Sequence, residues 1–86
     1  MFRVIWKKSV LKKLKSLDKS VASKIYQKVE THLVLDPVSL GKPLGHKFSG
    51  LFSFRSGNYR VIYSIKRSEL YICVVKVGHR KDVYEE

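Results

Sequence analysis

The sequence has few of the residues that mark secreted, metal-binding or membrane-spanning proteins. Its 86 residues include one cysteine, Cys73, so no disulfide can form within the chain and no zinc-binding cysteine spacing exists. The apolar stretch near the N-terminus is only a few residues long and is interrupted by Arg3, which is unlike a signal peptide or a membrane span. These features predict a cytoplasmic protein that uses no metal or cofactor and does not enter a membrane.

Acidic residues are also scarce. The chain has 7 Asp+Glu against 18 Lys+Arg, a formal net charge of +11. A charge of this size on one small domain, residues 1–86, indicates an anionic partner such as nucleic acid, a ribosome, an acidic protein or a membrane surface. Between Pro37 and Ser68 there are six basic residues and no acidic one.

The periodicity of apolar residues changes halfway along the chain. Residues 2–6 (FRVIW) read as a strand, and two helices follow, the second of which should end at Asp36-Pro37 because the residue before proline resists the helical region. Residues 38–50 are rich in glycine and read as a loop. Three strand-like runs follow: LFSFR, YRVIYSI and LYICVVKV. The order β-α-α-β-β-β predicts an α+β fold, a small and mostly antiparallel sheet with two helices packed on one face.

The first hairpin has a turn that fixes its register. If Gly57-Asn58 is a two-residue turn, Arg55 faces Arg60 directly across the two strands. Like charges placed opposite each other destabilise a sheet. The pair therefore indicates that an anion binds between them, although a longer bulged loop would shift the pairing by one residue.

The second hairpin sets the position of the last strand. With Arg67-Ser68 as turn residues, Lys66 faces Glu69, Cys73 faces Ile62, and Arg60 lies opposite Val75. The last strand then ends at Gly78. This register predicts that three arginines gather at one end of the sheet: Arg55, Arg60 and Arg80.

Two motifs in the second half of the chain are similar to those of a known family. The sequence GNYRVIYSI followed by LYICVVKVGHRKDVY, after two apolar helices, resembles the RelE/ParE superfamily of bacterial toxins, and most closely its RelE-like branch. The segment LGHKFSGLFSFR is also similar to the YoeB relatives. The resemblance covers nearly the whole chain and implies the same small sheet with two helices on one side.

The RelE-like branch cleaves mRNA in the ribosomal A site, without a metal, by attack of the RNA 2′-hydroxyl on the adjacent phosphate. The resemblance implies that activity here, with mRNA, the ribosome and a cognate acidic antitoxin as partners. Arg60 and Arg80 match the arginines that bind the scissile phosphate, and Tyr84 matches the tyrosine that stacks on a base or assists proton transfer. Arg55 and Lys47 are expected to bind RNA phosphate.

The general base does not carry over from the family. Leu51 and Ser53 stand where the RelE-like toxins have lysines, and the YoeB glutamate has no match in LGKPLGHKFSG. An unperturbed imidazole titrates at about pH 6.5, which makes His79 the first candidate, with Lys47 and His46 behind it.

Two other functions fit the same fold. A ParE-like toxin would poison DNA gyrase through protein contacts and would need no nuclease residues. A non-catalytic basic module would bind RNA or DNA without cleaving it. Ribosome-dependent mRNA cleavage separates the first interpretation from both.

Overall fold

A five-stranded sheet forms the centre of the computed structural model, which describes residues 1–84. The strand order is β1-β5-β4-β3-β2, with β1 parallel to β5 and every other pair antiparallel. The predicted α+β fold is confirmed, and a short strand, β2, is added inside the predicted loop. The strands are β1 (Arg3–Trp6), β2 (Lys42–Pro43), β3 (Phe52–Ser56), β4 (Tyr59–Lys66) and β5 (Tyr71–His79).

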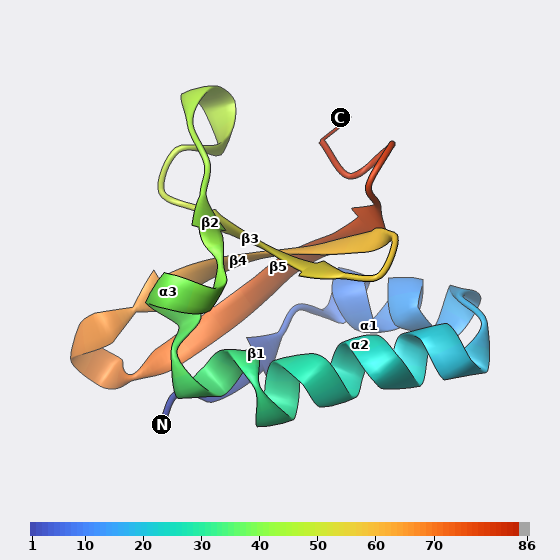
Figure 1. Ribbon diagram of the computed structural model, residues 1–86, viewed down its shortest axis with the longest axis horizontal. Helices are drawn as coiled ribbons and strands as arrows, with labels where there is room; N and C mark the ends of the chain where they lie inside the picture. The colour runs from blue at the N-terminus through green and yellow to red at the C-terminus, as the bar shows by residue number, and fades with distance from the viewer. Residues whose placement is uncertain (85–86) are drawn as a thin grey trace.

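The two long helices cover one face of the sheet, as Figure 1 shows. On the opposite side lie the loop before β3 and the C-terminal segment, which both rise away from the helices in that view. The helices are α1 (Lys8–Ser16), α2 (Lys19–Thr31) and α3 (Pro37–Leu40). Residues 1–84 also contain three short 3₁₀ turns: η1 (Leu33–Leu35), η2 (His46–Phe48) and η3 (Arg67–Glu69).

The second helix ends earlier than its sequence predicts. It stops at Thr31, and Pro37 begins the short helix α3 instead of simply ending α2. Proline is well suited to the first helical position because that residue needs no N–H donor there. The Asp36 carboxylate accepts a hydrogen bond from the Ser39 N–H at 3.2 Å, which caps α3.

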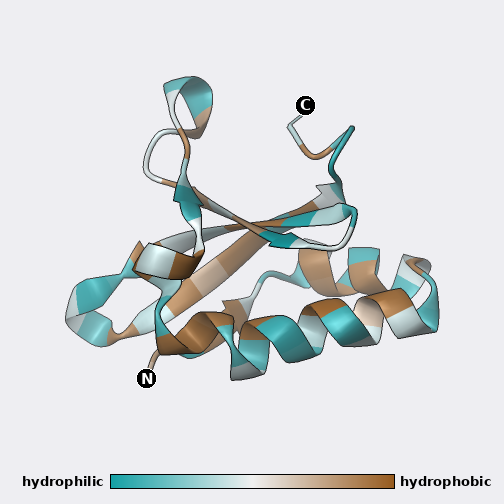
Figure 2. Cartoon of the chain, in the orientation of Figure 1, coloured by the Kyte–Doolittle hydropathy of each residue, from teal (hydrophilic) through white to brown (hydrophobic). Residues whose placement is uncertain are grey.

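The main hydrophobic core lies between the helices and the sheet. Figure 2 shows apolar colour on both layers and hydrophilic colour on the β4–β5 connection. No helix within residues 1–84 has the length and apolar character needed to cross a membrane. The fully enclosed core residues include Ile25, Val29, Leu33, Val61, Tyr63, Ile72 and Val74.

Tyr63 ties the sheet to the segment before β2. Its ring is 0% exposed, and its hydroxyl donates a 2.6 Å hydrogen bond to the Pro37 carbonyl. Burial, and secondarily the Asp36 carboxylate, raise the pKa of Tyr63 well above its usual range. Gly41 is required beside it, because a Cβ at position 41 would overlap the Tyr63 phenol oxygen.

Tyr63→Phe is expected to lower the free energy of unfolding by about 1–3 kcal/mol, since it leaves the Pro37 carbonyl without its donor in a buried position. Urea denaturation monitored by circular dichroism measures the change. Tyr26→Phe is the matched control, because Tyr26 is 46% exposed and its hydroxyl makes no hydrogen bond within residues 1–84. Equal stability of the two variants would contradict this account of Tyr63.

Candidate functional site

The sheet face opposite the helices carries a pair of facing arginines; we call this side the arginine face. The predicted register is confirmed, with Arg55 directly opposite Arg60. Gly57 has a φ of 60° and Asn58 does not have a positive φ, which is the type II′ pattern of a two-residue turn. The Phe54–Val61 pair beside the arginines lies in the helix-side core, so the two arginines point the other way.

No acidic side chain neutralises this pair within residues 1–84. Arg55 donates from Nε to the Gly57 carbonyl at 3.1 Å, a hydrogen bond to a neutral group. The guanidinium of the half-buried Arg60 makes no hydrogen bond or ion pair to any of the described residues. Directly opposed side chains have Cβ atoms only about 5 Å apart, so an anion between them would relieve their repulsion.

Arg80 lies at the same end of the sheet. Arg60 pairs with Gly78, two residues before Arg80, and the Arg80 N–H donates to the Asn58 carbonyl at 2.8 Å. This bond ties the end of β5 to the β3–β4 turn. The backbone therefore places Arg55, Arg60 and Arg80 at the same end of the sheet, with the Arg80 side chain exposed.

Residues 79–84 form a C-terminal segment that folds back over the arginine face. The N–H groups of Asp82 and Val83 both donate to the His79 carbonyl, at 2.8 and 2.9 Å. A Cβ built on Gly78 would lie 3.4 Å from Val83, so the segment passes close to the sheet. Val83 and Ile62 are each 1% exposed although neither belongs to the helix-side core. Figure 2 shows this short apolar stretch within a hydrophilic segment.

Tyr84 is held by contacts on the same face. Its hydroxyl donates to the Ser53 Oγ at 3.2 Å, and its ring meets the Phe48 ring edge-on at 5.5 Å. The Lys47 ammonium lies 5.9 Å from the centre of the Phe48 ring. Ser53 is two residues before Arg55, about 7 Å along the strand. Tyr84 is thus held on the arginine face, and Lys47 lies beside its partner Phe48.

The structure does not bring His79 together with these residues. His79 pairs with Tyr59, and the two rings meet edge-on at 5.6 Å on the helix side of the sheet. Its Nδ1 already accepts a hydrogen bond from the Lys81 N–H at 3.2 Å. His79 therefore faces away from Arg55 and Arg60, and His46 and Lys47 in η2 remain as the other candidate bases.

The predicted β4–β5 register is wrong. Lys66 pairs with Tyr71 and not with Glu69, because η3 makes the connection longer than a two-residue turn and Leu70 adopts a left-handed φ of 52°. Cys73 accordingly faces Ser64, not Ile62.

A β-bulge then shifts the pairing once more. Tyr63 pairs with Val74, whereas Ile62 pairs with Lys76, so Val75 is the extra residue and Arg60 faces Gly78 instead of Val75. Lys76 consequently lies on the arginine face, a position that the sequence analysis missed. Strict alternation from Ile72 and Val74 would have buried Lys76 in the core. A lysine at such a position was the one indication in the sequence that the strand is irregular.

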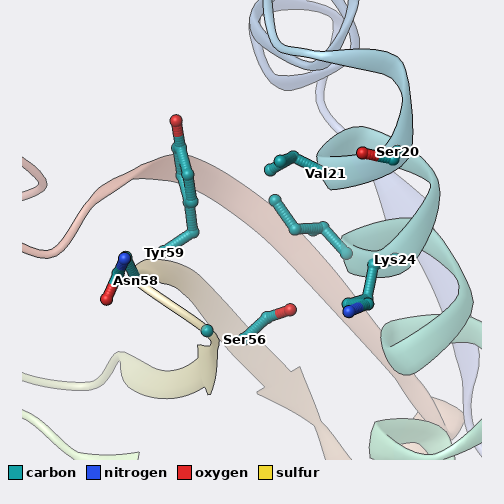
Figure 3. A pocket seen from close by; sticks show the side chains of 8 residues that line it. Ser20, Val21, Lys24, Ser56, Asn58 and Tyr59 are labelled. Atoms are coloured by element: carbon teal, nitrogen blue, oxygen red, sulfur yellow. The ribbon is translucent and has the colours of Figure 1, made fainter.

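A separate cavity of about 230 Å³ lies on the helix side, between α2 and the β3–β4 turn. Figure 3 shows the Ser56 hydroxyl and the Lys24 side chain pointing toward one another across it. Because Ser56 and Tyr59 face the helices, this cavity does not open onto the arginine face. It is lined by Ser20, Val21, Lys24, Ile25, Ser56, Gly57, Asn58 and Tyr59.

The arrangement on the arginine face is suited to an anion with several oxygens. Arginine presents a planar fork of donors that matches phosphate, and the Tyr84 and Phe48 rings meet on the same face. Within residues 1–84, no group of three His, Cys, Asp or Glu side chains is placed so that it could hold a metal ion. The geometry therefore favours phosphate binding by side-chain cations.

Comparison with known families identifies the chain. Residues 4–84 match the family described as the ParE toxin of the type II toxin–antitoxin system, parDE. The chain belongs to this toxin family. The resemblance to the RelE/ParE superfamily that its motifs predict is thereby confirmed.

Two curated toxins of Mycobacterium tuberculosis (strain ATCC 25618 / H37Rv) are similar to this ParE-family toxin. Toxin RelE is 32% identical over 71 residues, which cover 83% of this chain and 73% of that toxin. Toxin RelG is 39% identical over 49 residues, 57% of this chain and 56% of RelG. The chain thus spans little more than half the length of RelG.

Solved structures share the fold. A chain in the RelBE2 toxin–antitoxin complex from Mycobacterium tuberculosis superposes with a TM-score of 0.87 at 27% identity, covering 94% of this chain and 93% of that one. The isolated Escherichia coli RelE toxin gives a TM-score of 0.74 over 92% of this chain and 84% of that one. Its identity is 17%, so this second likeness concerns the fold alone.

Proposed function

We propose that this toxin is a ribosome-dependent endoribonuclease that cleaves mRNA in the A site and so inhibits translation. The observation that carries the proposal is the unneutralised pair Arg55 and Arg60, which the backbone places at the same end of the sheet as Arg80. A nuclease of this type has to stabilise a phosphorane whose negative charge exceeds that of the ground-state phosphate. Fixed cations aimed at that charge are an effective means of doing so.

The proposed reaction needs no covalent bond to the protein. The RNA 2′-oxygen attacks the adjacent phosphorus, a 2′-O–P bond forms, and the P–O5′ bond breaks. The 2′-hydroxyl proton passes to a base, and the leaving 5′-oxygen receives a proton. The products are a 2′,3′-cyclic phosphate and a 5′-hydroxyl. Arg60 and Arg80 bind the phosphate oxygens in this scheme, and Arg55 holds a neighbouring phosphate.

Tyr84 and Lys47 take the remaining roles. Tyr84 stands with its exposed ring beside Phe48, so it can stack on a base of the message while its hydroxyl stays on Ser53. Lys47 lies next to this pair and replaces His79 as the leading candidate for proton transfer, because His79 faces the other side of the sheet. A net charge of +11 supports binding to ribosomal RNA in the cytoplasm.

Primer extension on a translated message tests the proposal. The purified toxin is expected to produce cuts at A-site codons in a reconstituted translation reaction, and to leave the same message intact when ribosomes are omitted. Intact mRNA in the presence of translating ribosomes would contradict the nuclease assignment. Cleavage of naked RNA at the same rate would contradict its dependence on the ribosome.

Gyrase poisoning is the second candidate function. It is favoured by the match of residues 4–84 to a family described by its ParE toxin, and by the absence of lysine at positions 51 and 53. A gyrase supercoiling assay with the purified toxin distinguishes the two. Inhibition of supercoiling without mRNA cleavage would establish this alternative.

An acidic antitoxin is the proposed protein partner. The RelBE2 relative was solved as a toxin–antitoxin complex, and this chain offers an apolar groove of about 630 Å³ between α1 and α2 with lysines at its rim. Such a groove is suited to the apolar side of a partner helix whose acidic side chains meet the lysines. The groove is lined by Leu11, Leu14, Lys15, Leu17, Lys19, Ala22, Ser23 and Tyr26.

A further inference from the structure

The bulge at Val75 re-aims one side chain of β5. In a regular strand, side chains alternate between the two faces, so Lys76 would follow Ile72 and Val74 into the helix-side core. The extra residue reverses the alternation, and Lys76 pairs with Ile62 on the arginine face while Val77 returns to the core. Bulges are frequent beside active sites, where they direct a side chain to a new position.

Lys76 consequently belongs to one of two adjacent rows that cross the sheet. The first row is Arg55, Arg60 and Gly78, and the second is Ser53, Ile62 and Lys76. Diagonal neighbours in such rows are about 7–8 Å apart, so Lys76 is a diagonal neighbour of Arg60. Gly78, directly opposite Arg60, has no side chain of its own, and Val83 of the C-terminal segment packs against it.

The surroundings of Lys76 favour a specific role over a solvated surface position. Lys76 is half-buried, and Ile62 opposite it is 1% exposed beneath the C-terminal segment. At the other end of its row, Ser53 holds the Tyr84 hydroxyl. The four-carbon stem of a lysine is long enough to carry its ammonium across this distance toward the group held by Arg60.

We propose that Lys76 is a further phosphate-binding cation of this site, placed there by the Val75 bulge and contacting the same RNA phosphate as Arg60 or the next one along the strand. The proposal rests on the proposed function. It supplies from β5 a positive charge in the row next to Arg60 on the arginine face. Lys76 acts by its charge, so arginine should replace it.

The test uses Lys76→Met and Lys76→Arg in the translated-message cleavage assay. Lys76→Met keeps the apolar stem but removes the charge, and we expect its single-turnover cleavage rate to fall at least about tenfold. Lys76→Arg is expected to stay within about threefold of wild type. Lys66→Met is the matched control, because Lys66 is an exposed lysine of β4 at the far end of the same strand pair, opposite Tyr71. A Lys76→Met rate within twofold of wild type, or a loss equal to that of Lys66→Met, would overturn the proposal.

A second measurement separates this inference from the nuclease assignment. Binding of a fluorescently labelled single-stranded RNA 12-mer is measured at several salt concentrations. Removing one phosphate contact should reduce the slope of log K against log salt by about 1 in Lys76→Met and leave it unchanged in Lys66→Met. If the wild-type toxin leaves the translated message intact in the cleavage assay but still binds this RNA, the nuclease assignment fails while this slope still decides the role of Lys76. An unchanged slope in Lys76→Met would refute phosphate binding by Lys76.

Discussion

Arg60→Ala is expected to lower mRNA cleavage by about 10²–10³-fold, because it removes a fixed donor from the charge that develops in the transition state. The same substitution should not weaken the fold. Arg60 faces Arg55 directly and has no hydrogen bond or ion pair within residues 1–84, so its removal relieves repulsion between like charges. We expect the free energy of unfolding to stay the same or to rise by up to about 1 kcal/mol.

This combination of lost activity and retained stability is what separates a binding residue from a structural one. Cleavage rates come from primer extension on a translated message, and stability comes from urea denaturation of the same preparations. Arg67→Ala is the control: Arg67 is an exposed arginine of η3, beyond the far end of β4, and its loss changes the net charge equally. If Arg60→Ala cleaved as fast as Arg67→Ala, the arginine face would not be the catalytic surface.

The first hairpin could be predicted in detail because its information is local. A two-residue turn at Gly57-Asn58 fixes which residues face each other, and alternation then assigns the faces. The register of Arg55 and Arg60 follows from these few residues alone. The prediction that an anion binds there needed only the cost of placing two like charges in contact.

The second hairpin could not be predicted in the same way. Its connection is the 3₁₀ turn η3, which is followed by Leu70 in the left-handed backbone conformation. Most residues avoid this conformation, and no turn motif in the sequence indicates it. The bulge at Val75 then depends on packing across the whole sheet, because it places Val77 in the core and Lys76 outside it. Because of these two irregularities, the position of Lys76 could not be predicted from the sequence.

The direction of the His79 side chain also could not be predicted from the sequence. Sequence proximity to Arg80 suggested that both side chains serve one site, but His79 is the last residue of β5 and Arg80 begins the turn that follows. The edge-on contact between His79 and Tyr59 places the imidazole on the helix side. The chemistry of the imidazole therefore suggested His79 as a base, but only the structure shows to which side of the sheet this side chain points.

The C-terminal segment is expected to be as important for activity as the arginines on the sheet. Val83→Asp should detach residues 79–84 from the arginine face, because position 83 is 1% exposed and a carboxylate there would be cut off from water. Burial of a valine side chain stabilises a fold by about 1.5–3 kcal/mol, and we expect a loss of that size in the free energy of unfolding. Val83 is not part of the helix-side core, so the sheet and both long helices should stay folded.

Detachment should remove two functional groups at once. Tyr84 would lose the contacts with Ser53 and Phe48 that place its ring, and Arg80 would lose the turn that follows it. We therefore expect cleavage to fall on the order of 10²-fold or more, although no proposed RNA-binding residue has been changed. Ser68→Asp is the control, because it adds the same negative charge at an exposed position in η3.

Hydrogen exchange reports the detachment independently of activity. The amide protons of Asp82 and Val83 are protected in the wild type by their bonds to the His79 carbonyl, and both should exchange much faster in Val83→Asp than in Ser68→Asp. Fast exchange together with lost cleavage would show that the docked segment is part of the site. Fast exchange with wild-type cleavage would mean that RNA binding does not need Tyr84 and Arg80 to be held in advance, and the site would then consist of the sheet residues alone.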